Sequence, residues 1–235
     1  MGNQQRFAKI AAVLRRRQPD LTVVMDNVHK PHNLAAIART CDAVGIQEVH
    51  AVSADHGIRL TQRAASGCRK WITIRSHRSI ADAYRELRRR GFRLYAAHLD
   101  DRARDFREID YTAPTAIVVG AELDGLSPAA AAGSDGTLII PLAGFVQSLN
   151  VSVATALILF EAYRQRQAAG FYDHCRLDGE TYRRLLFEWL HPKVAAYCRR
   201  HQLPYPALDD RGEISEPLAN DHQRRQQLRP GRKLP

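Results

Sequence analysis

The residues best suited to chemistry gather where a predicted strand gives way to a helix, in the stretch IPLAGFVQSLNVSVATALILFEAYRQRQ (140–167). Four small polar side chains lie in this corner: Gln147, Ser148, Asn150 and Ser152. The start of a helix needs only one such oxygen as a cap, so four exceed that need. Their short reach suits them to hold a polar ligand beside backbone groups that regular structure leaves unpaired. We therefore expect a ligand site at this corner.

A second set of polar residues lies in HKPHNLAAIART (29–40), which follows another predicted strand. Asn33 is a suitable N-cap for the next helix, and Arg39 lies off the apolar stripe of that helix. Six residues correspond to about 240° around a helix, so Asn33 and Arg39 share no helical face. They can serve one site only if Asn33 points from the loop before the helix, or if a second subunit contributes.

A third stretch, VVGAELDGLS (118–127), carries two glycines five residues apart. This spacing is similar to a phosphate-binding loop, but no Lys-Ser/Thr pair follows it, and no GxGxxG occurs anywhere in the chain. A P-loop and an ordinary dinucleotide site are therefore disfavoured. Glu122 could hold an arginine or an amide donor, or it could equally lie in solvent.

Apolar, β-branched runs alternate with helical patterns from residue 20 to residue 170. The predicted strands cover 21–28, 48–52, 71–75, 92–99, 115–120 and 137–142. The predicted helices cover 5–16, 33–45, 61–68, 79–91, about 152–169, 179–190 and 193–201. This alternation predicts an α/β fold with a mostly parallel sheet flanked by helices. Ligands of such sheets lie beyond the carboxyl ends of the strands, and the three polar stretches follow such ends.

The charge balance favours a polyanionic partner. The net charge is +10 and the pI is near 9.8, which suits nucleic acid or an anionic membrane surface. The first 17 residues and the final stretch RRQQLRPGRKLP are basic and contain no acid. Each terminus alone could be a solvated tail, but two basic ends favour nucleic acid, because phosphate contacts supply most sequence-independent affinity. The N-terminal residues expected to bind RNA are Arg6, Lys9, Arg15, Arg16 and Arg17.

Other functional classes find little support. No apolar run approaches the roughly 20 residues that cross a bilayer, and the N-terminus carries arginines where a secretory signal needs an apolar stretch. The cysteines are isolated, without the close pairs of a zinc or redox site. We expect a reduced, cytoplasmic protein with no membrane segment and no metal.

Three motifs together resemble, in order and spacing, those of the knotted SPOUT-class RNA 2′-O-methyltransferases: NLAAIART, VVGAELDGLS and IIPLAGFVQSLNVSVATALILFEA. The flanking RRQPDLTVVMDNVHKPHN, DFREIDYT and LPYP are similar to the branch that modifies guanosine 18 in the tRNA D-loop. The likeness is strong over residues 5–170 and looser over 171–207. The third motif is long and specific, whereas the first would be weak alone.

The resemblance implies S-adenosylmethionine as cofactor, tRNA as substrate, and a homodimer with the active site near the subunit interface. It also implies a deep C-terminal trefoil knot, which pattern alone would not predict, because threaded chains are rare. With the helical extensions, the expected organisation is a basic N-terminal helical extension (1–19), a SPOUT catalytic domain (20–170), and a C-terminal helical extension with a basic tail (171–235).

The same resemblance implies roles for individual residues. The cofactor would be lined by Ala97, Leu99, Gly120, Ile140, Leu142 and Leu149, largely through backbone contacts and apolar packing. The residues expected to act in catalysis are Arg39, Asn33, Glu122, Ser148 and Asn150. An arginine stays protonated at neutral pH, so Arg39 is expected to fix the ribose-phosphate and stabilise the developing alkoxide rather than act as a base.

Three other hypotheses remain open at this point. The first is methylation of an rRNA ribose, which core motifs cannot distinguish from tRNA methylation, although the flanking segments favour tRNA. The second is a non-catalytic RNA-binding module on the same scaffold, which would be expected to show a damaged motif. The third, an unrelated basic α/β protein, would need three ordered matches by accident.

Overall fold

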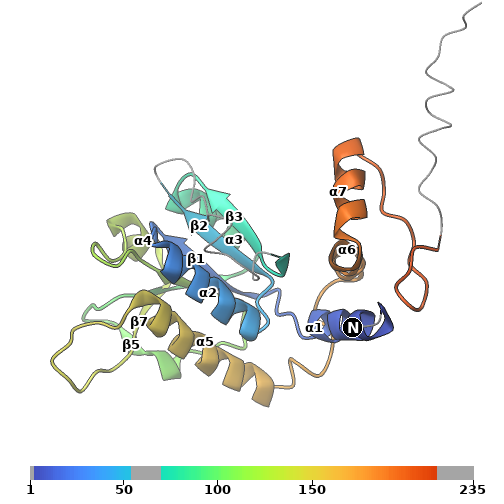
Figure 1. Cartoon of the computed structure of the whole chain (residues 1–235). Helices are drawn as coiled ribbons and strands as arrows, with labels where there is room; N and C mark the ends of the chain where they lie inside the picture. Colours follow the sequence, from blue (N-terminus) through green and yellow to red (C-terminus); the bar gives the residue numbers. More distant parts are fainter. Residues whose placement is uncertain (1–2, 54–69, 216–235) are drawn as a thin grey trace, which may run out of the picture. The chain divides into compact units, whose positions relative to one another are not determined.

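The computed structural model describes residues 3–53 and 70–215, which form two compact units (Figure 1). The sheet unit spans residues 15–177, and the helical unit combines residues 3–14 with 178–215. The two ends of the chain, expected as separate extensions, therefore belong to one unit, and the boundaries fall at 14/15 and 177/178. The helix predicted over 61–68 and the basic tail lie outside the described residues.

A seven-stranded parallel sheet in the order β3-β2-β1-β6-β4-β7-β5 forms the middle of the sheet unit. Its strands are β1 (Leu21–Asp26), β2 (Glu48–Val52), β3 (Thr73–His77), β4 (Arg93–Ala97), β5 (Arg104–Asp105), β6 (Thr115–Val119) and β7 (Gly136–Ile139). Every residue of β1 and β6 is buried, which agrees with their continuous apolar runs. These two strands pair in register from Leu21 opposite Thr115 to Met25 opposite Val119.

Helices cover both faces of the sheet (Figure 1). They are α2 (Pro31–Ala43), α3 (Ile80–Arg89), α4 (Pro128–Gly133) and α5 (Val151–Ala168), with a short 3₁₀ turn, η2 (Phe106–Glu108). One apolar cluster joins Ile37 and Cys41 of α2 to Ile158 and Leu159 of α5. A second cluster packs α3 and α4 against the opposite face of the sheet. The α/β architecture predicted from the sequence is confirmed.

The start of α2 differs from the prediction. Its N-cap is Lys30, and Pro31 is the first helical residue, where a fixed φ and a missing amide cost nothing. Asn33 is therefore not the cap but a buried residue inside the first turn. This placement frees its side-chain amide to bond elsewhere.

The helical unit consists of α1 (Asn3–Arg15, up to Leu14), α6 (Gly179–Leu190) and α7 (Pro192–His201). Asp178 caps α6 by accepting a hydrogen bond from the Thr181 amide at 2.8 Å. The rings of Phe187 and Tyr205 stack with their centroids 4.7 Å apart. The stacked rings tie the segment after α7 to α6.

Candidate functional site

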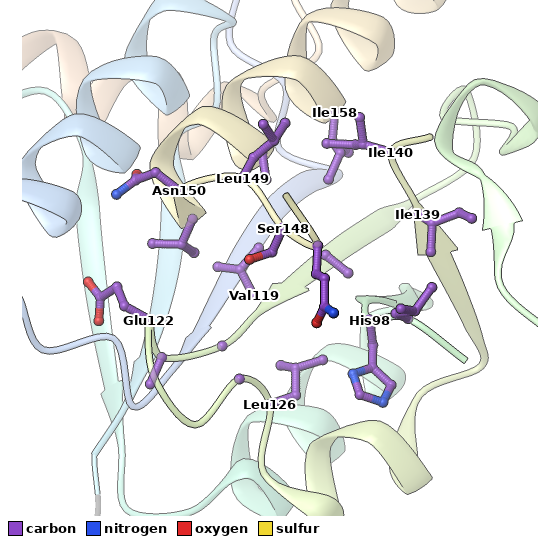
Figure 2. Close-up of a pocket in the computed structure, with 18 of the residues that line it drawn as sticks. His98, Val119, Glu122, Leu126, Ile139, Ile140, Ser148, Leu149, Asn150 and Ile158 are labelled. Carbon is purple, nitrogen blue, oxygen red and sulfur yellow. The ribbon is translucent and has the colours of Figure 1, made fainter. Parts of the chain in front are cut away.

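A cavity of about 690 Å³ opens at the carboxyl ends of β4, β6 and β7 (Figure 2). Its wall consists of the loops that follow β4 and β6 together with the long connection from β7 to α5. This edge is where a parallel sheet leaves backbone groups unpaired and accessible to a ligand. The wall includes all six residues predicted to line a cofactor: Ala97, Leu99, Gly120, Ile140, Leu142 and Leu149.

A chain of hydrogen bonds runs along the polar side of this cavity. The Asn33 Nδ2 group donates a short hydrogen bond to Glu122 Oε1. Asn150 Nδ2 donates in turn to Asn33 Oδ1 at 3.3 Å. Asn150 Oδ1 accepts from the Ser152 amide at 2.9 Å and from its hydroxyl at 2.6 Å, which caps α5. Three distant stretches of the sequence are thus connected at one point.

Glu122 is held as an ionised carboxylate. Burial raises its pKa, but the hydrogen bond from Asn33, a backbone hydrogen bond and the nearby charges of Lys30 and His29 outweigh burial, so the pKa lies below its ordinary value. The second oxygen, Oε2, is buried and has no hydrogen-bond partner within the described residues. A buried acceptor of this kind is costly unless a donor reaches it.

A tight turn after β6 positions Glu122. Ala121 and Gly125 exchange two backbone hydrogen bonds at 2.9 and 3.0 Å. A side chain at Gly120 would lie 2.2 Å from the Gly125 backbone, so this position requires glycine. Asp26 at the end of β1 accepts from the Ser127 amide at 2.8 Å and fixes the far end of the turn. The glycine pair is therefore a means of close backbone approach rather than a phosphate loop.

Two ionisable residues of the cavity wall were not singled out by the sequence analysis. His98 follows β4 directly, and Figure 2 shows its ring at the cavity, across from Glu122. Lys30 lies at the start of α2. His98 lies between the predicted cofactor residues Ala97 and Leu99, at the end of a strand. This position could have identified it as a residue of the cavity wall, because residues just beyond strand ends commonly face the ligand. Nothing in the pattern distinguished Lys30 from an ordinary solvated lysine.

The five residues expected to act in catalysis are only partly brought together. Ser148 lines the cavity beside the chain of hydrogen bonds that joins Asn33, Glu122 and Asn150 (Figure 2). Arg39 is exposed on α2 and does not line the cavity, whereas Asn33 is buried. Because Asn33 belongs to the helix itself, only the alternative in which a second subunit contributes still allows both to serve one site.

The basic residues near the N-terminus differ in their exposure to solvent. Arg6, Lys9, Arg15 and Arg16 are exposed. Arg17 is fully buried, and its guanidinium donates to the Ile46 carbonyl at 2.9 Å, to Asp42 at 2.7 Å and to the Trp71 carbonyl at 3.1 Å. The prediction that Arg17 binds RNA is therefore wrong, because its side chain serves the interior.

No group of three or more His, Cys, Asp or Glu side chains in residues 3–53 and 70–215 is placed to hold a metal ion. Over the same ranges, no helix has both the length and the apolar character that a membrane span requires.

Comparison with known proteins agrees with this geometry. The model of the SpoU rRNA methylase family matches residues 20–160, and that of the SpoU rRNA methylase C-terminal region matches residues 164–217. A tRNA (guanosine(18)-2′-O)-methyltransferase from Escherichia coli K12 is 51% identical over 214 residues, covering 90% of this chain and 93% of that protein.

Solved structures show the same relationship. The A. aeolicus TrmH/SpoU tRNA modifying enzyme superposes with a TM-score of 0.76 at 39% identity, covering 82% of this chain and 98% of that one. An AdoMet-bound rRNA methyltransferase from Sinorhizobium meliloti superposes at 0.55 with 33% identity, covering 66% of this chain and 59% of that one. The chain therefore belongs to the SpoU rRNA methylase family.

Proposed function

We propose that this protein methylates the 2′-oxygen of guanosine 18 in tRNA, using S-adenosylmethionine. The observation that carries the proposal is the cavity in which Glu122, Asn33 and Asn150 form one chain of hydrogen bonds beside an apolar wall. The 51% identical relative named for this reaction supports the choice of tRNA and of the nucleotide. We place the reaction in the cytoplasm, in keeping with the tRNA named in the description of that relative.

The cavity fits the cofactor in volume and in character. Ligand sites for molecules of this size are about 300–1,000 Å³ and largely apolar, with a few placed polar groups. Here Leu138, Ile140 and Leu149 supply apolar wall, and the glycine turn at Gly120 lets backbone approach closely. The ionised Glu122 suits a cationic group nearby. When bound, S-adenosylmethionine would supply a methyl group on a sulfonium sulfur, and the neutral thioether is a good leaving group.

The protein's task is then to align a poorly acidic hydroxyl, which can contribute several kcal/mol (about 7–11 in well-oriented cases). Arg39 presents two parallel donors to the ribose and its phosphate and stabilises the developing alkoxide. Asn33 and Asn150 fix Glu122, and Ser148 orients the cofactor and the loop at the cavity wall. These roles account for Ser148 and Asn150, and the cap of α5 accounts for Ser152.

We further propose that the protein is a homodimer in which Arg39 of one subunit completes the site of the other. Val153, Leu157 and Phe160 repeat along one face of α5 and are between 43% and 53% exposed. Burying this apolar face against a second copy would bring a new set of side chains to the edge of the cavity. Glu122 Oε2, which has no partner within the described residues, would accept a hydrogen bond from the incoming arginine.

Two other features remain proposals. Arg6, Lys9, Arg15 and Arg16 grip phosphates of the tRNA, which is read largely by shape and backbone. The connection from β7 to α5 is threaded as a trefoil knot, which accounts for the irregular backbone around Ser148. A crystal structure traced from Leu99 to Val151 would test the threading.

The central experiment is a methylation assay with mapping of the product. Purified protein is incubated with methyl-labelled S-adenosylmethionine and unmodified tRNA, and the alkali-resistant nucleotide is located. Label is expected at guanosine 18, and a tRNA carrying 2′-deoxyguanosine at that position should accept none. Label in ribosomal RNA but not in tRNA would overturn the proposed substrate, and label in neither would overturn the enzymatic function.

The shared site is tested with mixed dimers. Arg39→Ala and Glu122→Ala subunits carrying different affinity tags are co-expressed, and only dimers that hold both tags are purified. Each mixed dimer would contain one site with neither change, so about half of the wild-type activity is expected although both parents are inactive. No recovery of activity would show that both residues act within one subunit.

A further inference from the structure

Lys30 and His98 are ionisable groups of the cavity wall that the reaction described above does not use, and Lys30 is the one that carries a fixed positive charge. Among the described residues that line the cavity, the other ionisable side chains are His98 and Glu122. Figure 2 shows Glu122 and Asn150 on one side of the cavity and His98 on the other.

Lys30 belongs to the side of the cavity where the hydrogen-bonded chain lies. Its carbonyl accepts from the Asn33 amide at 3.0 Å and from the Leu34 amide at 3.1 Å, so its position is fixed by the first turn of α2. It is also near enough to Glu122 to help lower the pKa of that carboxyl. Under the proposed function, methyl transfer takes place at this side, where Asn33, Glu122 and Asn150 meet.

The Lys30 ammonium is free to engage a ligand. Within residues 3–53 and 70–215, its side chain forms no hydrogen bond and no ion pair. An ammonium carries three donors, so it can face the carboxylate and still reach an anion outside. The positive end of α2 adds to the local attraction for an anion.

We propose that Lys30 binds a phosphate that flanks the ribose to be methylated and so holds the nucleotide over the cavity. This inference rests on the proposed function. An RNA phosphate is favoured over the carboxylate of the cofactor, because the predicted cofactor residues Ala97, Leu99 and Ile140 belong to the apolar wall. A ribose held at the polar side brings its own phosphates to the part of the cavity that Lys30 lines.

The experiment compares Lys30→Gln with Lys30→Arg and with Arg85→Gln. Arg85 lies on α3, across the sheet, and pairs there with Asp82, so its replacement removes one positive charge without touching the cavity. Loss of one charged hydrogen bond is expected to raise the KM for tRNA about tenfold in Lys30→Gln. The slope of log KM against log salt should become shallower by about one unit. Lys30→Arg should restore most of both quantities, and Arg85→Gln should resemble wild type.

The controls separate this inference from the function on which it rests. If the wild-type protein fails to methylate tRNA, the proposed function is wrong. If wild type is active and Lys30→Gln behaves like Arg85→Gln, Lys30 does not bind phosphate. Weaker S-adenosylmethionine binding to Lys30→Gln, measured by isothermal titration, with an unchanged salt slope would assign the lysine to the cofactor and also overturn the inference.

Discussion

Asn150 uses both ends of its side-chain amide. The oxygen caps α5 through Ser152, and the nitrogen donates to Asn33 and thereby joins the chain that ends at Glu122. One residue thus sets the start of a helix and the position of a carboxylate. Because the two contacts use different atoms, substitutions can separate them.

Asn150→Asp is expected to retain folding but lose most methylation. The aspartate oxygen still caps α5, so the thermal midpoint should stay near that of wild type. Its carboxylate cannot donate to Asn33, and activity should fall about tenfold or more. Asn150→Ala loses the cap as well, with a cost of about 1 kcal/mol in unfolding free energy. Equal activity in Asn150→Asp and wild type would show that the asparagine serves the helix alone.

His50 makes the stability of the sheet unit depend on pH. It is fully buried on β2, with Nδ1 2.8 Å from Nε2 of His77, and burial lowers its pKa to about 4 despite the neighbouring Glu48. The unfolded chain binds a proton below about pH 6.5 while the folded chain does not until about pH 4, so stability falls as the pH falls through this window.

The expected loss from this histidine between pH 7 and pH 5 is about 2 kcal/mol in the free energy of unfolding. Denaturant titrations of wild type and His50→Gln at both pH values measure it. Carboxylates contribute equally to both proteins, so the difference between them isolates the histidine. A loss in His50→Gln as large as that in wild type would contradict the assignment.

At the scale of elements, the C-terminal half of α5 is anchored to the start of β1 through a buried cation. Arg166 is fully buried and donates to Asp20 at 2.6 Å, to Gln18 at 3.1 Å and to the Tyr111 carbonyl at 2.8 Å. Asp20 also accepts from Arg176 at 2.6 Å. Arginine suits this role because it offers five donors in a fixed plane.

Arg166→Met should destabilise the protein by about 3–5 kcal/mol, because it leaves buried acceptors and a carboxylate with fewer partners. Arg164→Met is the matched control on the same helix. Its side chain is 68% exposed and pairs with Glu161, so its replacement should cost less than about 1 kcal/mol. Chemical denaturation of both variants makes the comparison, and similar small losses would contradict a structural role for Arg166.

The elements show how far sequence reasoning reaches. β2 and α6 were predicted with their observed bounds, because alternating or helical apolar patterns mark them clearly. β5 and α4 were missed, since two or six residues are too short to display a period. The strand predicted over 71–75 lies at Thr73–His77, where exposed polar residues on an edge strand conceal its pattern.

Within the candidate site, the sequence motifs identified the residues that meet there, but they did not predict the burial or the hydrogen-bond partners of those residues. The pattern identified Asn33, Glu122 and Asn150, but it placed Asn33 at a cap rather than in a buried hydrogen-bonded chain. It could not distinguish Arg16 from Arg17, because adjacent arginines look alike until the fold buries one of them. Long-range partners such as Asp42 and Trp71 decide that difference, and local sequence does not contain them.

At the scale of the whole molecule, a net charge of +10 sets the expected dependence on salt. A protein that releases counterions from phosphates binds RNA more weakly as salt rises, and each lysine or arginine contact adds to the slope. Only cations that reach solvent contribute. Arg16 is exposed, while Arg17 is fully buried and bonded to Asp42.

Substitutions at Arg16 and Arg17 should therefore affect different properties, RNA binding in the first case and stability in the second. Arg16→Gln is expected to leave the thermal midpoint unchanged and to make the slope of log Kd for tRNA against log salt shallower by about one unit. Arg17→Gln should lower stability by about 3–5 kcal/mol, because it removes a buried guanidinium from Asp42 and from two backbone carbonyls, while the fraction that remains folded binds tRNA with the wild-type slope. Filter binding at several salt concentrations, with thermal denaturation on the same samples, measures both quantities. A shallower slope for Arg17→Gln at full folding would mean that this side chain leaves the interior to meet RNA, and a wild-type slope for Arg16→Gln would remove that residue from the RNA-binding surface.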